Sequence, residues 1–149
     1  MKFKRVIMGI LLLFSLTAFT ACSGETGEKA NVNNTIEVDL DLTKLSSTMV
    51  YSEVYNMMYT PSDYIGKTIK MQGAFSVGYS KDTGLYYPAV IIADATACCA
   101  QGVEFVLKGN PSYPNGYPQR GKEITVMGTF TTYKEGVTVY CHLVEAEIL

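Results

Sequence analysis

Two segments of the sequence repeat one pattern of apolar and polar positions. Residues 66–75 and 121–130 both follow G-K-x-I-x-[MV]-x-G-x-F, so that apolar side chains occupy alternate positions. Alternation of this kind places the apolar side chains on one face of a β-strand. A glycine within each strand (Gly73 and Gly128) indicates a bend or a bulge, which a small barrel needs in order to coil. The repeat therefore predicts two equivalent, bent strands.

Three more strands and one helix are predicted around the repeat. Apolar runs indicate strands over residues 85–93, 103–107 and 137–146. Upstream, Ser46 or Ser47 can cap a helix that reaches about Tyr59. The apolar side chains of this helix recur at helical spacing, which is typical of core packing. Residues 36–42 alternate apolar and acidic side chains and predict a short strand or an extended arm.

The number and order of these strands resemble an OB-fold, a five-stranded Greek-key barrel. The two repeated strands then correspond to the first and the fourth. OB-folds usually place a helix between the third and fourth strands, but residues 108–120 are rich in proline and glycine and predict an irregular loop. We therefore expect a mainly β domain: a five-stranded, partly open OB-like barrel with one N-terminal helix. A generic small β-barrel or sandwich is the alternative.

The first 35 residues predict a membrane anchor. Residues 1–21 have a basic start and an apolar run, which are typical of a secretory leader. The small residues before Cys22 resemble the lipobox of bacterial lipoproteins, although Phe19 stands where that pattern usually has an aliphatic residue. The resemblance implies that Cys22 carries an N-terminal lipid, that residues 22–35 form a flexible tether, and that the domain of residues 36–149 lies on the extracytoplasmic face of the bacterial cell membrane. An ordinary signal peptide is the alternative.

Composition and charge narrow the classes of function. The chain of 149 residues is 48% hydrophobic and 17% charged, which is enough apolar material for one packed domain. Without the three basic residues of the leader, nine basic and fourteen acidic side chains remain, a net charge of −5. Because affinity for a phosphate backbone comes largely from Lys and Arg, we expect no nucleic-acid partner. A single histidine and the lack of a phosphate-binding loop or paired carboxylates argue against an enzyme.

Cysteines are the main candidates for chemistry, and three remain if Cys22 is acylated. Cys98 and Cys99 are adjacent in a predicted turn between strands, and Cys141 precedes the single histidine, His142. Three interpretations stay open. They are a site for a soft metal ion such as Zn²⁺ or Cu(I), a disulfide from Cys141 to Cys98 or Cys99, and buried, inert thiols.

Strand geometry limits the metal interpretation. Cys141 and His142 are adjacent in a predicted strand and so point to opposite faces, whereas Cys98 and Cys99 can converge in a turn. At most three thiolates are available, with Asp94, water or a displaced His142 to complete the shell. Because this ligand count leaves a structural zinc site incomplete, the pattern favours a transfer or Cu(I) site. The sequence also has no C-x-x-C spacing, the strong signal for zinc or thioredoxin chemistry. Cys141 is expected to lie within bonding reach of Cys98 or Cys99.

Residues 94–100 (Asp-Ala-Thr-Ala-Cys-Cys-Ala), with the strands on either side, resemble part of a known group of proteins. The similarity is to the C-terminal OB-like domain of the uncharacterised YcgQ-type bacterial membrane proteins, which carry a Cys-Cys-Ala motif after an apolar strand. Those proteins are suspected partners of a permease in metal homeostasis. The resemblance covers about residues 60–149 and implies a role for Cys98 and Cys99 beside an envelope or permease protein. This chain has a predicted lipid anchor in place of membrane helices.

A second candidate surface is the loop rich in proline and tyrosine. Tyr113 and Tyr117 could form an aromatic platform for a peptide or a sugar, although packing on the barrel is the commoner role of such residues. Two functions therefore stay open. In the first, a membrane-anchored extracytoplasmic domain binds a soft metal ion through the cysteines. In the second, the domain is an interaction module for another envelope protein, and its cysteines are structural or redox-active and hold no metal.

Replacement of Cys22 tests the anchor. Cys22→Ala should abolish incorporation of labelled palmitate and release the protein from the membrane fraction, because the diacyl group would be attached to that sulfur. Metabolic labelling followed by fractionation measures both effects. Cys98→Ala is the matched control and should keep the label. Unchanged labelling of Cys22→Ala would show that Cys22 is not the site of lipid attachment.

Overall fold

Regular structure in the described part of the chain begins at Leu40. The computed structural model describes residues 37–149, and the predicted leader, Cys22 and tether lie outside the described residues. The helical elements are η1 (Leu42–Lys44), α1 (Ser47–Tyr59) and η2 (Pro61–Asp63). The strands are β1 (Leu40–Asp41), β2 (Thr68–Tyr79), β3 (Tyr86–Ala93), β4 (Ala100–Leu107), β5 (Glu123–Glu135) and β6 (Thr138–Ile148). Within residues 37–149, no helix has the length and apolar character needed to traverse a bilayer.

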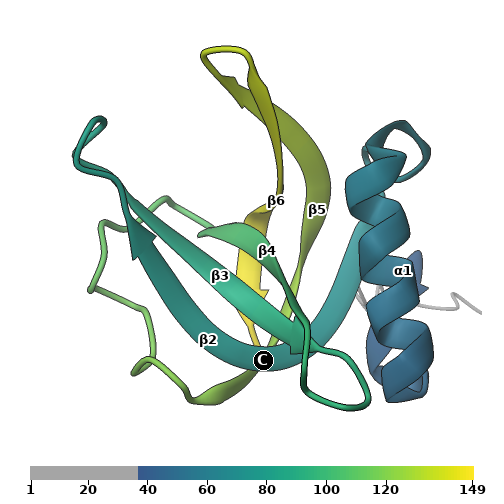
Figure 1. Cartoon of the computed structure of the whole chain (residues 1–149). Helices are drawn as coiled ribbons and strands as arrows, with labels where there is room; N and C mark the ends of the chain where they lie inside the picture. Colours follow the sequence, from purple (N-terminus) through teal and green to yellow (C-terminus); the bar gives the residue numbers. More distant parts are fainter. Residues whose placement is uncertain (1–36) are drawn as a thin grey trace, which may run out of the picture. The chain divides into compact units, whose positions relative to one another are not determined.

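The strands form one sheet that curls into a partly closed barrel (Figure 1). Antiparallel pairing joins β2 to β3, β3 to β4, and β5 to β6. Two further pairings bring distant strands together: β5 lies antiparallel to β2, and β6 lies parallel to β4. The prediction of a mainly β, OB-like barrel preceded by one helix is confirmed.

Residues 37–149 form six strands, whereas the predicted barrel had five. The additional strand, β1, has only two residues and pairs in parallel with β2, at the place where a short strand or an arm was expected. A strand of two residues is too short to show a period of its own. The connection from β4 to β5 contains turns and no helix, as its proline and glycine content predicted.

The two repeated segments pair with each other. In the ladder between β2 and β5, Ile69 pairs with Gly128 and Gly73 pairs with Ile124. Each glycine therefore lies opposite the isoleucine of the other copy, about a local two-fold axis. The predicted equivalence of the two glycines is confirmed, and the sequence repeat corresponds to a structural symmetry.

β2 changes its pairing partner within its own length. Residues 68–74 pair with β5, and residues 74–79 pair with β3. A Cβ atom at Gly73 would lie 2.4 Å from the carbonyl oxygen of Ile91, and one at Gly128 would lie 2.9 Å from that of Val144. Both separations are shorter than non-bonded carbon and oxygen atoms tolerate. Glycine is required at these positions because another strand's backbone approaches too closely for a side chain.

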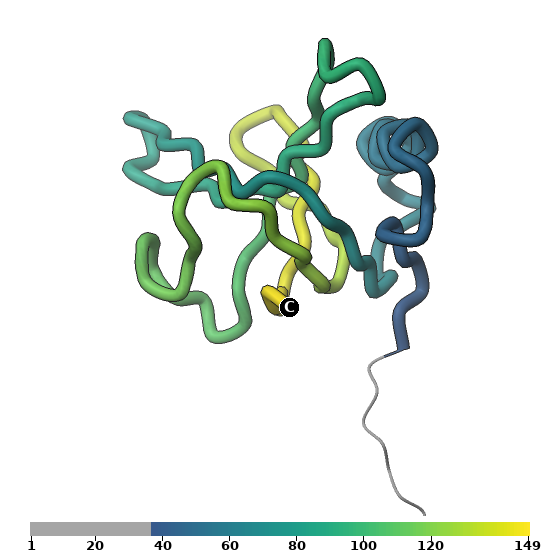
Figure 2. Tube along the Cα trace, turned by 90° about the horizontal axis from the view of Figure 1, so that it is seen from below, coloured from purple at the N-terminus to yellow at the C-terminus, as the bar shows by residue number. Residues whose placement is uncertain are grey.

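The apolar core fills the barrel and the space beneath α1. Figures 1 and 2 both place α1 on one side of the barrel, where it contacts β3 and β4. Val54 and Met57 of this helix are fully buried, so they pack in the core as their spacing predicted. The largest fully buried side chains of the core are Phe75, Phe105, Phe130, Leu42, Met57, Ile69, Met71 and Leu143.

The close approach at Gly73 generates a stability prediction. Gly73→Ala should lower the free energy of unfolding by about 2 kcal/mol or more, because the new methyl group overlaps backbone that cannot move aside. Gly78→Ala in the same strand is the matched control, since its Cβ would lie 3.9 Å from the nearest atom, the Cβ of Tyr87. Urea unfolding of both variants measures the difference. Equal stability of the two variants would contradict the close approach of the Ile91 backbone to Gly73.

Candidate functional site

The turn between β3 and β4 is built around the side chain of Asp94. Its Oδ1 atom accepts a hydrogen bond from the backbone N–H of Cys98 at 3.0 Å. The backbone N–H of Asp94 donates to the carbonyl oxygen of Cys99 at 2.9 Å. Aspartate is favoured in turns because its short side chain can bond backbone groups a few residues along. Asp94 therefore shapes the turn and draws both cysteines around its carboxylate.

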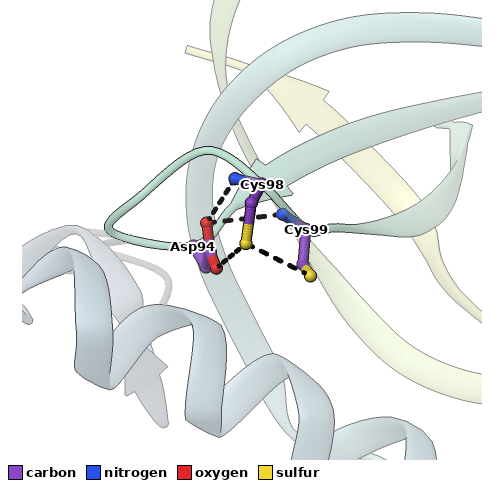
Figure 3. A group of neighbouring side chains, drawn as sticks. All are labelled: Asp94, Cys98 and Cys99. Atoms are coloured by element: carbon purple, nitrogen blue, oxygen red, sulfur yellow. Dashed lines mark hydrogen bonds between the residues drawn. The ribbon is translucent and has the colours of Figure 1, made fainter.

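The side chains of Asp94, Cys98 and Cys99 lie close together in this turn (Figure 3). The sulfur of Cys98 lies 3.2 Å from Oδ2 of Asp94 and 3.6 Å from the sulfur of Cys99. One ligand atom from each residue lies within 4.8 Å of the other two. A disulfide needs sulfurs about 2.0 Å apart, so these two thiols are not bonded, and both are free and exposed. We call Asp94, Cys98 and Cys99 the cysteine turn.

Hydrogen bonds set the protonation of the cysteine turn. The thiol of Cys98 donates to Asp94 and is the main cause that lowers the pKa of this carboxyl group. The pKa of Cys99 is raised, first by its hydrogen bond with Cys98 and further by partial desolvation and the nearby Asp94 carboxylate. The carboxylate is therefore ionised and Cys99 keeps its proton near neutral pH. Any metal ion at this position must displace that proton.

Cys141 lies away from the cysteine turn, contrary to the expectation that it would be within bonding reach. In the parallel ladder of β4 and β6, Glu104 pairs with His142, so Cys141 lies beside Val103. Cys99 precedes Val103 by four residues, which is about 13 Å of extended chain. A disulfide needs Cα atoms within about 7 Å. The expectation failed because it depended on the offset between two strands that are distant in sequence.

The surroundings of Cys141 and His142 also differ from those of the cysteine turn. Cys141 is half-buried against the core, with its sulfur 4.0 Å from the carbonyl oxygen of Met57, and burial raises its pKa. The ring of His142 lies 4.7 Å from that of Tyr133, between centroids, and burial lowers its pKa. The two neighbours thus have different environments, as adjacent positions in a strand predict. Neither belongs to the group of ligand atoms around Asp94.

Tyr113 and Tyr117 pack partly against the barrel, and both also border a hollow of about 400 Å³. The ring of Tyr117 lies 6.1 Å from that of Phe75 and 5.9 Å from that of Phe105, between centroids. The ring of Tyr113 lies between those of Tyr117 and Tyr86, with centroid separations of 5.9 and 5.0 Å. Both tyrosines are partly buried against the core, so the loop is held in place mainly by aromatic packing.

Sequence analysis missed a hollow on the face formed by β3, β4, β5 and β6. Here Tyr87 donates a hydrogen bond to Glu135, and Tyr133 donates one to Glu104 at 2.6 Å. These four residues border two adjoining hollows of about 310 and 410 Å³. Strand alternation would have placed Tyr133 and Glu135 on one face of β5. Their partners are 29 and 48 residues away, and only the strand register brings them together.

Comparison with known proteins gave one structural similarity. No protein-family model and no curated protein matches the chain. The solved structure that is similar is described as a "putative nucleic acid-binding lipoprotein" from Klebsiella pneumoniae. It shares 20% sequence identity with a TM-score of 0.43, over 67% of this chain and 87% of that chain.

One expectation is corrected by this comparison, and another receives no support from it. The absence of a nucleic-acid partner, expected from net charge, is corrected, because the similar structure is described as nucleic acid-binding. Net charge is a sum over the whole domain and does not describe a local binding face, so it was too coarse a basis for the exclusion. The resemblance to the YcgQ-type membrane proteins receives no support from the comparisons.

Thiol reactivity tests the placement of the cysteines. Cys98 and Cys99 are exposed and should be alkylated at least about tenfold faster than Cys141, because the Cys141 side chain is half-buried against the core. Timed alkylation of the folded protein followed by peptide mass spectrometry measures each rate. In urea the three rates should converge. Equally fast labelling of Cys141 in the folded state, or its recovery in a disulfide with Cys98 or Cys99, would contradict this arrangement.

Proposed function

We propose that this protein is a lipid-anchored extracytoplasmic protein whose OB-like domain binds a thiophilic metal ion, Zn²⁺ or Cu(I). The anchor is inferred from the lipobox-like sequence that ends at Cys22. The metal site is inferred from the cysteine turn. These two inferences are independent, and the experiments that test them differ.

The spacing of the ligand atoms is the observation that supports a metal ion. In a tetrahedral site with metal–sulfur bonds of about 2.3 Å, two sulfurs are about 3.8 Å apart. A sulfur and a carboxylate oxygen on the same ion are about 3.5 Å apart. The observed separations are 3.6 Å between the cysteine sulfurs and 3.2 Å between Cys98 and Asp94. These two separations are within a few tenths of an ångström of the values for a shared ion, and the third pair, the Cys99 sulfur and an Asp94 carboxylate oxygen, lies within 4.8 Å.

The exposure of the turn favours exchange over permanent binding. Structural zinc sites have four protein ligands and are closed, whereas this turn offers three ligand atoms and is open to solvent. The remaining position is open to water or to a donor atom from another molecule. Because Cys99 must lose its proton, and its pKa is raised, metal affinity should rise with pH up to the pKa of Cys99 and fall in acid.

Competition with a chromophoric chelator tests the site. All samples carry Cys22→Ser, so that Cys98, Cys99 and Cys141 are the remaining thiols. We expect one equivalent of metal to bind. Cys98→Ser and Cys99→Ser should each weaken binding by more than about 100-fold, because changes beyond the ligands themselves already cost about 10- to 100-fold. The stoichiometry and the affinity are measured separately for Zn²⁺ and for Cu(I).

Two further variants sharpen this test. Cys141→Ser is the matched control and should bind metal unchanged, because it removes a thiol that lies outside the cysteine turn. Asp94→Asn keeps an acceptor for the Cys98 N–H and removes the charged oxygen ligand, so it should weaken Zn²⁺ more than Cu(I), which prefers sulfur. Binding that is lost in Cys141→Ser, or retained in Cys98→Ser/Cys99→Ser, would contradict the proposal.

A further inference from the structure

A hollow that combines aromatic rings and carboxylates lies on the face formed by β3, β4, β5 and β6. We call it the tyrosine–glutamate hollow, and it is bordered by Tyr87, Glu104, Tyr133, Glu135, Tyr140 and His142. Its two adjoining parts have volumes of about 310 and 410 Å³. This is the lower end of the size range of small-molecule sites, about 300–1,000 Å³.

Both carboxylates of the hollow are held by tyrosine hydroxyl groups. Oε1 of Glu135 accepts from Tyr87, whose oxygen also lies 2.9 Å from the Thr83 hydroxyl oxygen. Oε2 of Glu104 accepts from Tyr133. Each glutamate thus uses one oxygen within the protein, and the other oxygen makes no side-chain bond among the described residues. The carboxylates are oriented before any ligand arrives.

The carboxylates of Glu104 and Glu135 form no ion pair within residues 37–149. Glu104 is half-buried, and burial, with Glu135 nearby, raises its pKa. The ion pairs of residues 37–149 are elsewhere, at Lys44 with Asp41 and at Lys108 with Glu147. Burial lowers the pKa of His142, so its ring is largely neutral at pH 7.

Lys134 also borders the wider part of the hollow. It forms no ion pair with Glu104 or Glu135 within residues 37–149. Two like charges at a partly desolvated position repel each other, and a cation bound between them would remove that repulsion.

Aromatic rings form a wall beside the carboxylates. Tyr133 stacks on Tyr140 with 5.4 Å between centroids and 22° between planes. The ring of His142 lies 4.7 Å from that of Tyr133, on the side of the wider part of the hollow. Tyrosine faces attract cations, and they also cover hydrocarbon. Carboxylates and tyrosine faces together select a ligand that has a positive head and an apolar body.

We propose that the tyrosine–glutamate hollow binds a small organic cation, with an ammonium group between Glu104 and Glu135 and a hydrocarbon part against Tyr133 and Tyr140. This site is separate from the cysteine turn. Tyr87 is the second residue of β3, whereas Asp94 follows the last residue of that strand. Binding at the hollow therefore does not depend on binding of a metal ion.

The single histidine makes the test direct. The imidazole resonances of His142 are recorded by NMR at pH 7 on the full chain in detergent micelles, while butylammonium is added. We expect a saturable shift. 1-Butanol, which has the same number of heavy atoms and no charge, should bind at least about tenfold more weakly, because it makes no charge-assisted hydrogen bond.

Charge-removing variants assign the effect to the two glutamates. Glu104→Gln and Glu135→Gln keep an oxygen that accepts from the tyrosine hydroxyl, so the fold should remain intact, and each should weaken butylammonium binding at least about tenfold. Glu147→Gln is the matched control. It removes the same charge from β6, where Glu147 pairs with Lys108 outside the hollow, and it should leave binding unchanged.

Three results would overturn the proposal. The first is equal binding of 1-butanol and butylammonium, which would mean that the hollow recognises only apolar bulk. The second is unchanged butylammonium binding in both Glu104→Gln and Glu135→Gln. The third is no saturable shift with butylammonium, and a saturable shift with maltose in its place would then identify a sugar surface.

Discussion

The close approach of strands at Gly73 is the constraint on which the rest of the structure depends. At Ala74, the next residue, β2 pairs with both Ile91 of β3 and Glu123 of β5, and no Cβ fits at Gly73 beneath the Ile91 carbonyl. This shared pairing bends β2 and brings β5 beside it. Only two residues separate β5 from β6, so β6 lies beside β5 and reaches the free edge of β4. The parallel pairing of β6 with β4 then closes this side of the barrel.

Curling of the sheet places two different chemical environments at the two ends of β3 and β4. At one end, Asp94 holds two exposed thiols through hydrogen bonds within a single turn. At the other end, tyrosines on β3 and β5 hold two glutamates across strands. Both arrangements fix a carboxylate by a hydrogen bond from a weakly acidic partner. The partners are thiols in one case and phenols in the other, and so the proposed ligands differ: a thiophilic metal ion and an organic cation.

The features that sequence predicted correctly depend on short-range order. The alternation of apolar and polar residues over ten positions predicted the repeated strands. Asp94 and Cys98 lie within one turn of six residues, so their proximity could be predicted without knowing how the strands pair. What sequence could not predict depends on strand offset. Cys141 was expected near the turn of Cys98 and Cys99 because the last strand was expected to return past that turn. The parallel ladder sets Glu104 beside His142, so Cys141 lies beside Val103, four residues or about 13 Å of extended chain beyond Cys99. The bond between Tyr133 and Glu104 depends on the same kind of long-range register.

The position of Cys141 bears on how the proposed metal site would work. A third thiolate would complete the coordination shell and make the site structural. The thiol of Cys141 instead packs against the core, near the Met57 carbonyl oxygen, and burial raises its pKa. The cysteine turn therefore has three ligand atoms of its own, on an exposed loop. A metal ion held there keeps one position for a ligand from outside. Such an incomplete shell can accept an ion from one donor and release it to another, which a closed four-ligand site at the same place could not do without unfolding the turn.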